Sequence, residues 1–124
     1  MKAGDTFLRP VRATENEKPH LWIVVTNPNK ENQILIVNLT TLKERQDQTV
    51  VLDVGDHPFV TKASSIFYRE AEIADNTKLE QAERAGAIAK REGCRPEVIK
   101  LVRDGVNASP HTRRAIKAFF NDNK

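Results

Sequence analysis

The sequence predicts a mainly β fold with α-helices at its C-terminal end, and three observations support this class. A chain of 124 residues has the length of one ordinary domain with a real core. Residues 1–74 contain short β-branched runs at near-regular spacing with turns between them, which indicates a small antiparallel β-barrel. Residues 75–124 change to helical spacing and predict three short α-helices packed on the barrel, the whole forming a single compact domain.

Five strands are expected in the first part of the chain. They are "DTFLRPV" (5–11), "HLWIVVTN" (20–27), "QILIVNLT" (33–40), "TVVLDV" (49–54) and "SSIFYREAEI" (64–73). The second and third are apolar at nearly every position, as expected for strands at the centre of a curled sheet, and the segment "PNKEN" between them is rich in turn residues. The polar segment 13–19 predicts a loop.

Three helices are expected in the second part. Leu79, Ala82, Gly86 and Ala89 form one apolar stripe, which predicts a helix from Thr77 that ends at Gly93. A second helix is expected to begin at Pro96 and end at Gly105. The third is expected to begin with Ser109 as N-cap and Pro110 in its first turn, placing Ile116, Phe119 and Phe120 on one face.

Composition excludes several classes of protein. With 39% hydrophobic and 30% charged residues the chain is typical of a globular protein and not of a disordered one. No apolar run is long enough to cross a bilayer, and the first residues lack the apolar core of a secretory signal. Cys94 is the only cysteine, so neither an internal disulfide nor a zinc cluster is expected. The cytoplasm is therefore the simplest compartment.

Charge is distributed unevenly along the chain. Residues 1–74 hold 9 Lys and Arg against 10 Asp and Glu, a net charge of −1, whereas residues 75–124 hold 11 against 7, a net charge of +4. A basic region can bind nucleic acid by neutralising phosphates. Here acidic residues are interspersed among the basic ones, so a solvated helix face is the favoured explanation.

Four short sequence signals resemble, in their order, the MazF/PemK/Kid family of toxin–antitoxin ribonucleases. They are "GDTFLRPV", "KPHLWIVVTNP", "ILIVNLTT" and "HPFVTKASSIFYREAEI". They look like the family's Gly-Asp first strand, its basic residue and proline before the second strand, its Leu-Thr-Ser/Thr end of the third, and its short helical turn followed by a strand. The resemblance covers residues 4–74 and implies a small SH3-like antiparallel barrel with appended helices.

The resemblance also implies an activity and partners. These are metal-independent cleavage of single-stranded RNA without a cofactor, homodimerisation through the barrel, and inhibition by a small antitoxin whose peptide occupies the RNA groove. Lys18 stands where the family usually has arginine, and Thr40 and Thr41 match its hydroxyl-bearing end of the third strand. Lysine offers a point charge in place of a planar fork, and the loop 13–19 has two glutamates and no glycine, so the activity stays open.

RNA cleavage by the 2′-hydroxyl needs a base, an acid and stabilisation of the charged phosphorane. We therefore predict His57, Lys18 and Thr40 as catalytic residues, because imidazole exchanges protons near neutral pH and Lys18 can bind phosphate. The predicted substrate-binding residues are Arg9, Arg12, Thr41, Ser64 and Tyr68. Arg9 and Arg12 flank Pro10 close to the Lys18 loop, where they would supply the missing arginine.

Several of the candidate residues also have a structural interpretation. His57 suits a turn cap in Gly-Asp-His-Pro, and Ser64 suits a turn cap or a strand start. One of Phe67 and Tyr68 is expected in the core and the other at the surface as a stacking platform for a base. His20 either shares the surface of Lys18 or faces solvent at a strand end.

Two functions remain open on the sequence. The first is a MazF/PemK-type endoribonuclease. The second is a non-catalytic module that binds protein or nucleic acid on the same barrel, which is favoured by the lysine at position 18, the acidic loop and the basic helical part.

Overall fold

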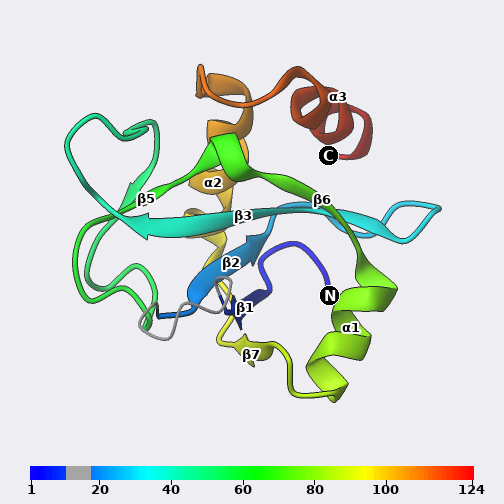
Figure 1. The fold of residues 1–124 in the computed structure, drawn as a ribbon. Helices are drawn as coiled ribbons and strands as arrows, with labels where there is room; N and C mark the ends of the chain where they lie inside the picture. The colour runs from blue at the N-terminus through cyan, green and yellow to red at the C-terminus, as the bar shows by residue number, and fades with distance from the viewer. Residues whose placement is uncertain (11–17) are drawn as a thin grey trace.

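The computed structural model describes residues 1–10 and 18–124, and these form one antiparallel sheet with three α-helices (Figure 1). The strands are β1 (Thr6–Arg9), β2 (His20–Val24), β3 (Gln33–Thr41), β4 (Val51–Leu52), β5 (Ser64–Ile66), β6 (Glu72–Asp75) and β7 (Ala89–Arg91). The helices are α1 (Asn76–Arg84), α2 (Pro96–Ala108) and α3 (Arg114–Asn123), with a 3₁₀ turn η1 (Tyr68–Glu70). The predicted combination of an antiparallel sheet and three helices is confirmed in this coarse form, although β7 follows α1.

The long strand β3 organises the sheet. One edge of β3 pairs with β2, and its other edge pairs with β6 along Gln33–Ile36 and with β5 along Leu39–Thr41. The sheet runs in the order β4-β5-β3-β2-β1-β7, with β6 branching from β3. Among the described residues no pairing joins β4 to β7, so the sheet is open and the predicted closed barrel is not observed.

Both faces of the sheet are buried, which explains why β2 and β3 are apolar at nearly every position. On one face, α2 and α3 cover Leu21, Ile23, Leu35 and Val37 with Val98, Val102, Val106, Ile116 and Phe120. On the other face, Phe7, Trp22, Val24, Ile34 and Ile36 pack together with Leu79 of α1. In Figure 1 the two C-terminal helices and α1 accordingly lie on opposite sides of β3.

The first predicted helix is too long. We expected it to run from Thr77 to Gly93, but α1 ends at Arg84 and Ala89–Arg91 form β7. Gly86 takes a positive φ of 78°, which turns the chain out of the helix at little steric cost. The following residues then gain backbone pairing with β1, in the register Leu8 to Ala89 and Thr6 to Arg91. Residues 75–124 are therefore not purely helical.

Three other element boundaries differ from the prediction. The expected strand 64–73 is divided by η1, in which Tyr68 turns inward and donates a hydrogen bond to the Val102 carbonyl over 2.7 Å. The second helix passes through Gly105 to Ala108. The third helix begins four residues later than a Ser109–Pro110 start would place it, at Arg114, because Ser109 caps the end of α2 instead. None of the described helices has the length and apolarity needed to cross a bilayer.

Asp47 ties the segment after β3 to the turn between α2 and α3. Its buried carboxylate accepts a hydrogen bond from the Ser109 hydroxyl at 2.5 Å and another from the Thr49 backbone N–H at 2.9 Å. Burial raises the pKa of Asp47, but these hydrogen bonds and the nearby His111 outweigh it and leave the pKa below its usual value. The native state thus favours the charged carboxylate more than the unfolded chain does.

A carboxyl group with a lowered native pKa stabilises the fold at neutral pH, and this contribution is lost as the pH falls through the native pKa. We expect Ser109→Ala to lower the free energy of unfolding by about 2 kcal/mol at neutral pH, and by clearly less in acid. Urea denaturation over a pH series measures both values. Ser64→Ala is the control, since its hydroxyl donates to the neutral Lys62 carbonyl and its effect should not change with pH. An effect of Ser109→Ala that is equal at all pH values would contradict the prediction.

Candidate nucleic-acid interface

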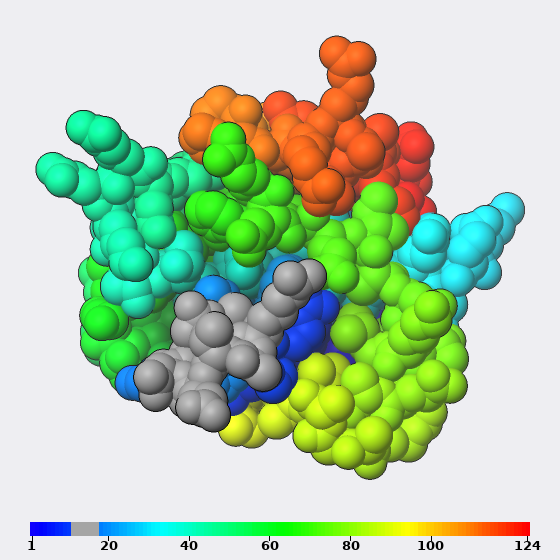
Figure 2. Space-filling model, viewed as in Figure 1, coloured from blue at the N-terminus to red at the C-terminus, as the bar shows by residue number. Residues whose placement is uncertain are grey.

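A surface hollow of about 660 Å³ lies where the start of β2, the end of β3 and the segment before β5 meet. We call it the Lys18 groove. It is lined by Lys18, Pro19, His20, Leu39, Thr40, Thr41, Lys43, Pro58, Phe59, Thr61, Lys62 and Ser64. In the space-filling view the segment after β3, in teal, and the segment between β4 and β5, in green, lie next to each other (Figure 2).

Strand pairing explains why these residues meet. Thr41 at the end of β3 is paired with Ser64 at the start of β5, and Thr40 with Ser65. The lysines beyond each strand end, Lys43 and Lys62, are therefore brought to the same rim. β2 pairs with β3 on its other edge, so the residues that precede β2 reach the groove from the opposite side. Antiparallel strand pairing thus brings three separate chain segments together at the groove.

The groove has a one-sided charge. Lys18, Lys43 and Lys62 are all exposed, and among the described residues that line the groove there is no aspartate or glutamate. Four hydroxyl groups, on Thr40, Thr41, Thr61 and Ser64, add hydrogen-bonding capacity. Exposed ammonium groups beside hydroxyls suit an anionic ligand with several oxygen atoms.

Phe59 adds an aromatic surface to the same groove. Phe59 is 39% exposed, and Pro58 also lines the groove. An exposed ring next to cationic groups can stack on a nucleobase while the cations hold the backbone phosphates. A single-stranded nucleic acid offers both features at once, because its bases are not hidden in a duplex.

Four of the eight predicted site residues lie in this groove. Lys18, Thr40, Thr41 and Ser64 all line it, which brings together the lysine loop and the end of the third strand as the prediction required. Arg12 lies outside the described residues. Arg9 is described but does not line the groove. Its guanidinium pairs with the Glu72 carboxylate at 2.7 Å and stacks over the Trp22 ring at 4.0 Å.

Tyr68 is a core residue and not a stacking platform. Its side chain is fully buried, and its hydroxyl is bonded to the Val102 carbonyl within α2. Burial, with smaller contributions from Asp47 and Asp104, raises the pKa of Tyr68 far above its ordinary value, so the phenol stays protonated. Of the two neighbouring aromatic residues considered, Tyr68 is the one in the core, and the exposed ring in the groove belongs to Phe59 instead.

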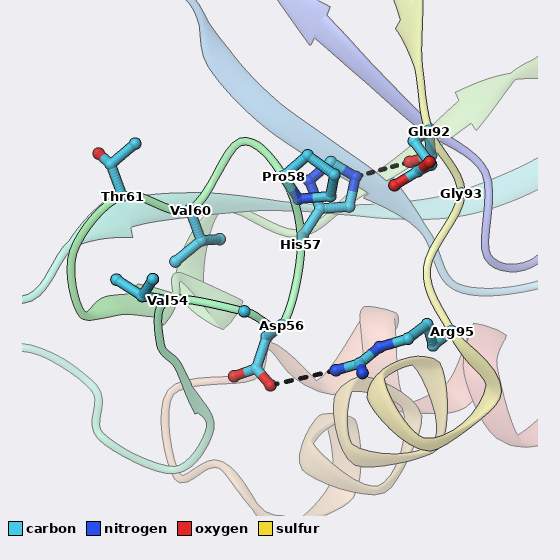
Figure 3. A pocket seen from close by; sticks show the side chains of 10 residues that line it. Val54, Asp56, His57, Pro58, Val60, Thr61, Glu92, Gly93 and Arg95 are labelled. Carbon is cyan, nitrogen blue, oxygen red and sulfur yellow. Dashed lines mark hydrogen bonds and ion pairs between the residues drawn. The ribbon is translucent and has the colours of Figure 1, made fainter.

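His57 is buried beside the groove and has both ring nitrogens engaged within the protein. Nδ1 accepts a hydrogen bond from the Phe59 backbone N–H at 3.0 Å, so the proton is on Nε2, which donates to the Glu92 carbonyl at 2.6 Å (Figure 3). The Thr6 hydroxyl donates to the same carbonyl at 2.7 Å. His57 thereby joins the loop before β5 to β1 and to the segment after β7, and it is only 4% exposed.

His57 does line a second hollow of about 580 Å³, which shares Pro58 and Thr61 with the Lys18 groove. Figure 3 shows this second hollow with Asp56 facing Arg95, whose charged groups are 3.6 Å apart. Because the ring nitrogens of His57 are already bonded, the side chain has no atom ready to exchange a proton with a ligand in the Lys18 groove.

We therefore expect His57→Ala to act on stability. The substitution removes the bonds to Glu92 and Phe59 and opens a cavity, which should cost about 3 kcal/mol of unfolding free energy. The affinity of the folded variant for single-stranded RNA should stay within about twofold of the wild-type affinity. Such a change is well below the tenfold change in affinity that corresponds to about 1.4 kcal/mol of binding free energy. Urea denaturation and fluorescence titration measure the two quantities. Normal stability combined with complete loss of RNA cleavage would instead identify His57 as catalytic.

Sequence reasoning missed Lys43, Lys62 and Phe59. The signal that could have found them is the pairing of the third and fifth predicted strands, because Lys43 follows one and Lys62 precedes the other. His20, which was considered but not selected, is the one histidine that lines the groove among the described residues.

Two further kinds of chemistry gain no support in the described part of the chain. Burial raises the pKa of the Cys94 thiol to about 11, which keeps it protonated and unreactive. In residues 1–10 and 18–124, no three His, Cys, Asp or Glu side chains gather where they could hold a metal ion.

Compared with known proteins, the chain matches no family model and no curated protein.

Proposed function

We propose that this protein is a MazF/PemK-like endoribonuclease that binds single-stranded RNA in the Lys18 groove and cleaves it without a metal ion. The observation that carries the proposal is the meeting of Lys18 with Thr40 and Thr41 in one groove. These residues come from separate segments; the resemblance implies phosphate binding for Lys18 and an assisting hydroxyl for Thr40. Their convergence is what a shared phosphate site requires.

The charge of the groove supports RNA as the ligand. Three exposed lysines without a lining carboxylate, among the residues described, favour a polyanion over a neutral or cationic ligand. Phe59 favours a single strand, since its exposed ring can stack only on a base that is not already stacked in a duplex. The hydroxyls of Thr40 and Thr41 would donate hydrogen bonds to the non-bridging phosphate oxygens.

The proposed reaction is an attack of the RNA 2′-hydroxyl on the adjacent phosphorus. The 2′-oxygen forms a bond to phosphorus and gives its proton to water, while the bond from phosphorus to the 5′-oxygen breaks. The Lys18 ammonium donates a proton to the departing oxygen and regains one from water, since its side chain is exposed. The products are a 2′,3′-cyclic phosphate and a 5′-hydroxyl. The threonine hydroxyls and lysines stabilise the extra negative charge of the phosphorane.

The same proposal includes the other properties that the resemblance implies. The protein would act in the cytoplasm as a homodimer, and a small antitoxin would inhibit it by placing a peptide in the Lys18 groove.

The first test is RNA binding as a function of salt. Three lysines that each neutralise one phosphate of a single strand should give a slope of log affinity against log salt of roughly −2. Cleavage of a labelled RNA in EDTA, with a cyclic phosphate at the new end, tests the reaction itself. Absence of binding at low salt would reject the whole proposal. Binding without cleavage at high protein concentration would reject the nuclease activity.

A second candidate function is a non-catalytic RNA-binding module that uses the same groove. One specific observation favours it: His57, the residue predicted to carry the proton, has both ring nitrogens bonded inside the protein. Lysine in place of arginine at position 18 points the same way. Under this alternative the protein still binds RNA in a salt-dependent manner, but it cleaves the RNA neither in EDTA nor in Mg²⁺.

A further inference from the structure

Three polar side chains next to the groove contact one another in a row: His20 of β2, Asn38 of β3 and Glu70 of η1. Asn38 belongs to β3 and is 2% exposed, although its neighbours on that face of the sheet, Ile36 and Trp22, are apolar. Its Nδ2 atom is 3.3 Å from the Glu70 carboxylate of η1 and 3.3 Å from His20 Nδ1 of β2. Burying an amide in an apolar sheet costs free energy unless the amide makes hydrogen bonds. The presence of Asn38 at this position therefore needs an explanation.

The Glu70 contact determines which way the Asn38 amide faces. A carboxylate only accepts hydrogen bonds, so the atom opposite it is the amide nitrogen and not the amide oxygen. The reverse orientation would place Asn38 Oδ1 against the negative charge of Glu70. The second hydrogen of the same NH₂ group then points to His20 Nδ1, which must accept it.

His20 is consequently held in one tautomer. Because Nδ1 accepts a hydrogen bond from Asn38, the single proton of the neutral ring is on Nε2. The ring also lines the Lys18 groove. Nδ1 is turned to Asn38, and Nε2–H, which has no hydrogen-bond partner among the described residues, is the ring group available to a ligand.

We propose that His20 is an additional RNA-binding residue, a neutral donor whose Nε2–H binds a phosphate oxygen in the Lys18 groove, and that Asn38 and Glu70 are positioning residues that hold it in this tautomer. The inference rests on the proposed function, since it names how the same groove holds its substrate. It adds to the three lysines a donor whose direction is set by the sheet.

The tautomer is tested by NMR without any reference to activity. Two-bond ¹H–¹⁵N correlations of the imidazole rings distinguish a ring protonated at Nε2 from one protonated at Nδ1, and the spectrum of His20→Phe assigns the His20 signals. The wild-type protein should show the Nε2–H form at neutral pH. An Nδ1–H form or a doubly protonated ring would overturn the proposal.

Two substitutions of the exposed Glu70 make this test sharper. In Glu70→Lys the ammonium donates, so the Asn38 amide should turn its oxygen toward both neighbours and His20 should change to the Nδ1–H tautomer. In Glu70→Gln the side-chain oxygen can still accept from Asn38, and the original tautomer should persist. A tautomer that does not respond to Glu70→Lys would overturn the positioning role.

Binding is measured with a 2′-O-methyl oligouridylate, which cannot be cleaved. His20→Phe should weaken binding about tenfold, as expected for loss of one hydrogen bond to a charged group. Glu70→Lys should also weaken it, even though it adds positive charge. Its control is Glu31→Lys, which makes the same charge change in the exposed turn at the opposite end of β3 and should not weaken binding.

The outcomes separate this proposal from the function on which it rests. If wild-type protein binds the oligouridylate and Lys18→Met weakens it, but His20→Phe binds as wild type, the role of His20 is wrong and the RNA groove stands. If neither the wild-type protein nor any variant binds the oligouridylate, the proposed function is rejected. The binding role of His20 is then rejected as well, whichever tautomer the spectra show.

Discussion

Replacing Gly105 with alanine is expected to destabilise the protein by roughly 2 to 3 kcal/mol, although alanine is the better helix former. Gly105 lies in α2, where helix propensity alone would predict a gain of up to about 1 kcal/mol. A Cβ atom at this position would lie 2.0 Å from the Tyr68 hydroxyl oxygen and 2.7 Å from Val50 Cγ2. Both neighbours are buried in the main core, so neither can move away at low cost.

Urea denaturation of the Gly105→Ala protein measures this loss of stability, and two further variants serve as references. Lys100→Ala on the exposed face of the same helix loses only a surface ion pair with Asp104 and should change stability by less than about 0.5 kcal/mol. In a double-mutant cycle with Tyr68→Phe, part of the Gly105→Ala cost should disappear, because the closest atom is gone. A stabilised Gly105→Ala protein would show that α2 is not packed on Tyr68 as described.

Replacing Lys18 with methionine should have the largest effect on the proposed activity. Under the nuclease hypothesis Lys18 binds the scissile phosphate and protonates the leaving oxygen, so its loss should lower the cleavage rate by about a hundredfold or more. Affinity for uncleavable RNA should fall as well, and the salt slope should become shallower by about 0.7, the share of one phosphate contact on a single strand. Stability should hardly change, since the side chain is exposed.

Two lysine variants serve as references for this measurement. Lys30→Met removes the same charge from the exposed turn between β2 and β3, outside the groove, and should leave cleavage and salt slope nearly unchanged. Lys18→Arg should bind at least as tightly as wild type, because a guanidinium can bind phosphate through two parallel hydrogen bonds. Equal losses in Lys18→Met and Lys30→Met would mean that only net charge matters and that the groove is not the site.

The strands could be predicted well because their signal is local. β2 and β3 are rich in β-branched and other apolar residues and are bounded by turn residues, so their existence and order follow from the local sequence alone. The helix predicted for 77–93 was found in its first part, as α1, but was too long, because a segment as short as Ala89–Arg91 has no periodicity that separates a helix from an edge strand. Pairing with β1 decided for the strand over Ala89–Arg91, and that partner is far away in the sequence.

The candidate site was predictable in part. Lys18, Thr40 and Thr41 could be named from the family resemblance and Ser64 from its hydroxyl at a predicted strand start, and the structure places all four in one groove. The state of the histidines could not be predicted in this way. His57 is bonded to a carbonyl 35 positions away, and the Nδ1 of His20 faces an asparagine on the neighbouring strand. A sequence pattern carries no information on such partners.

The sequence by itself determined that a strand-rich part precedes a helix-rich part, the apolar centre of the sheet and the basic and hydroxyl residues near its strand ends, because each depends on neighbours only a few positions apart. Tertiary structure alone decided that the sheet stays open, that β7 joins it, that three lysines share a groove, and which histidine faces that groove. Those outcomes depend on backbone pairing and buried hydrogen bonds between distant segments, whose free energies exist only once the chain has folded.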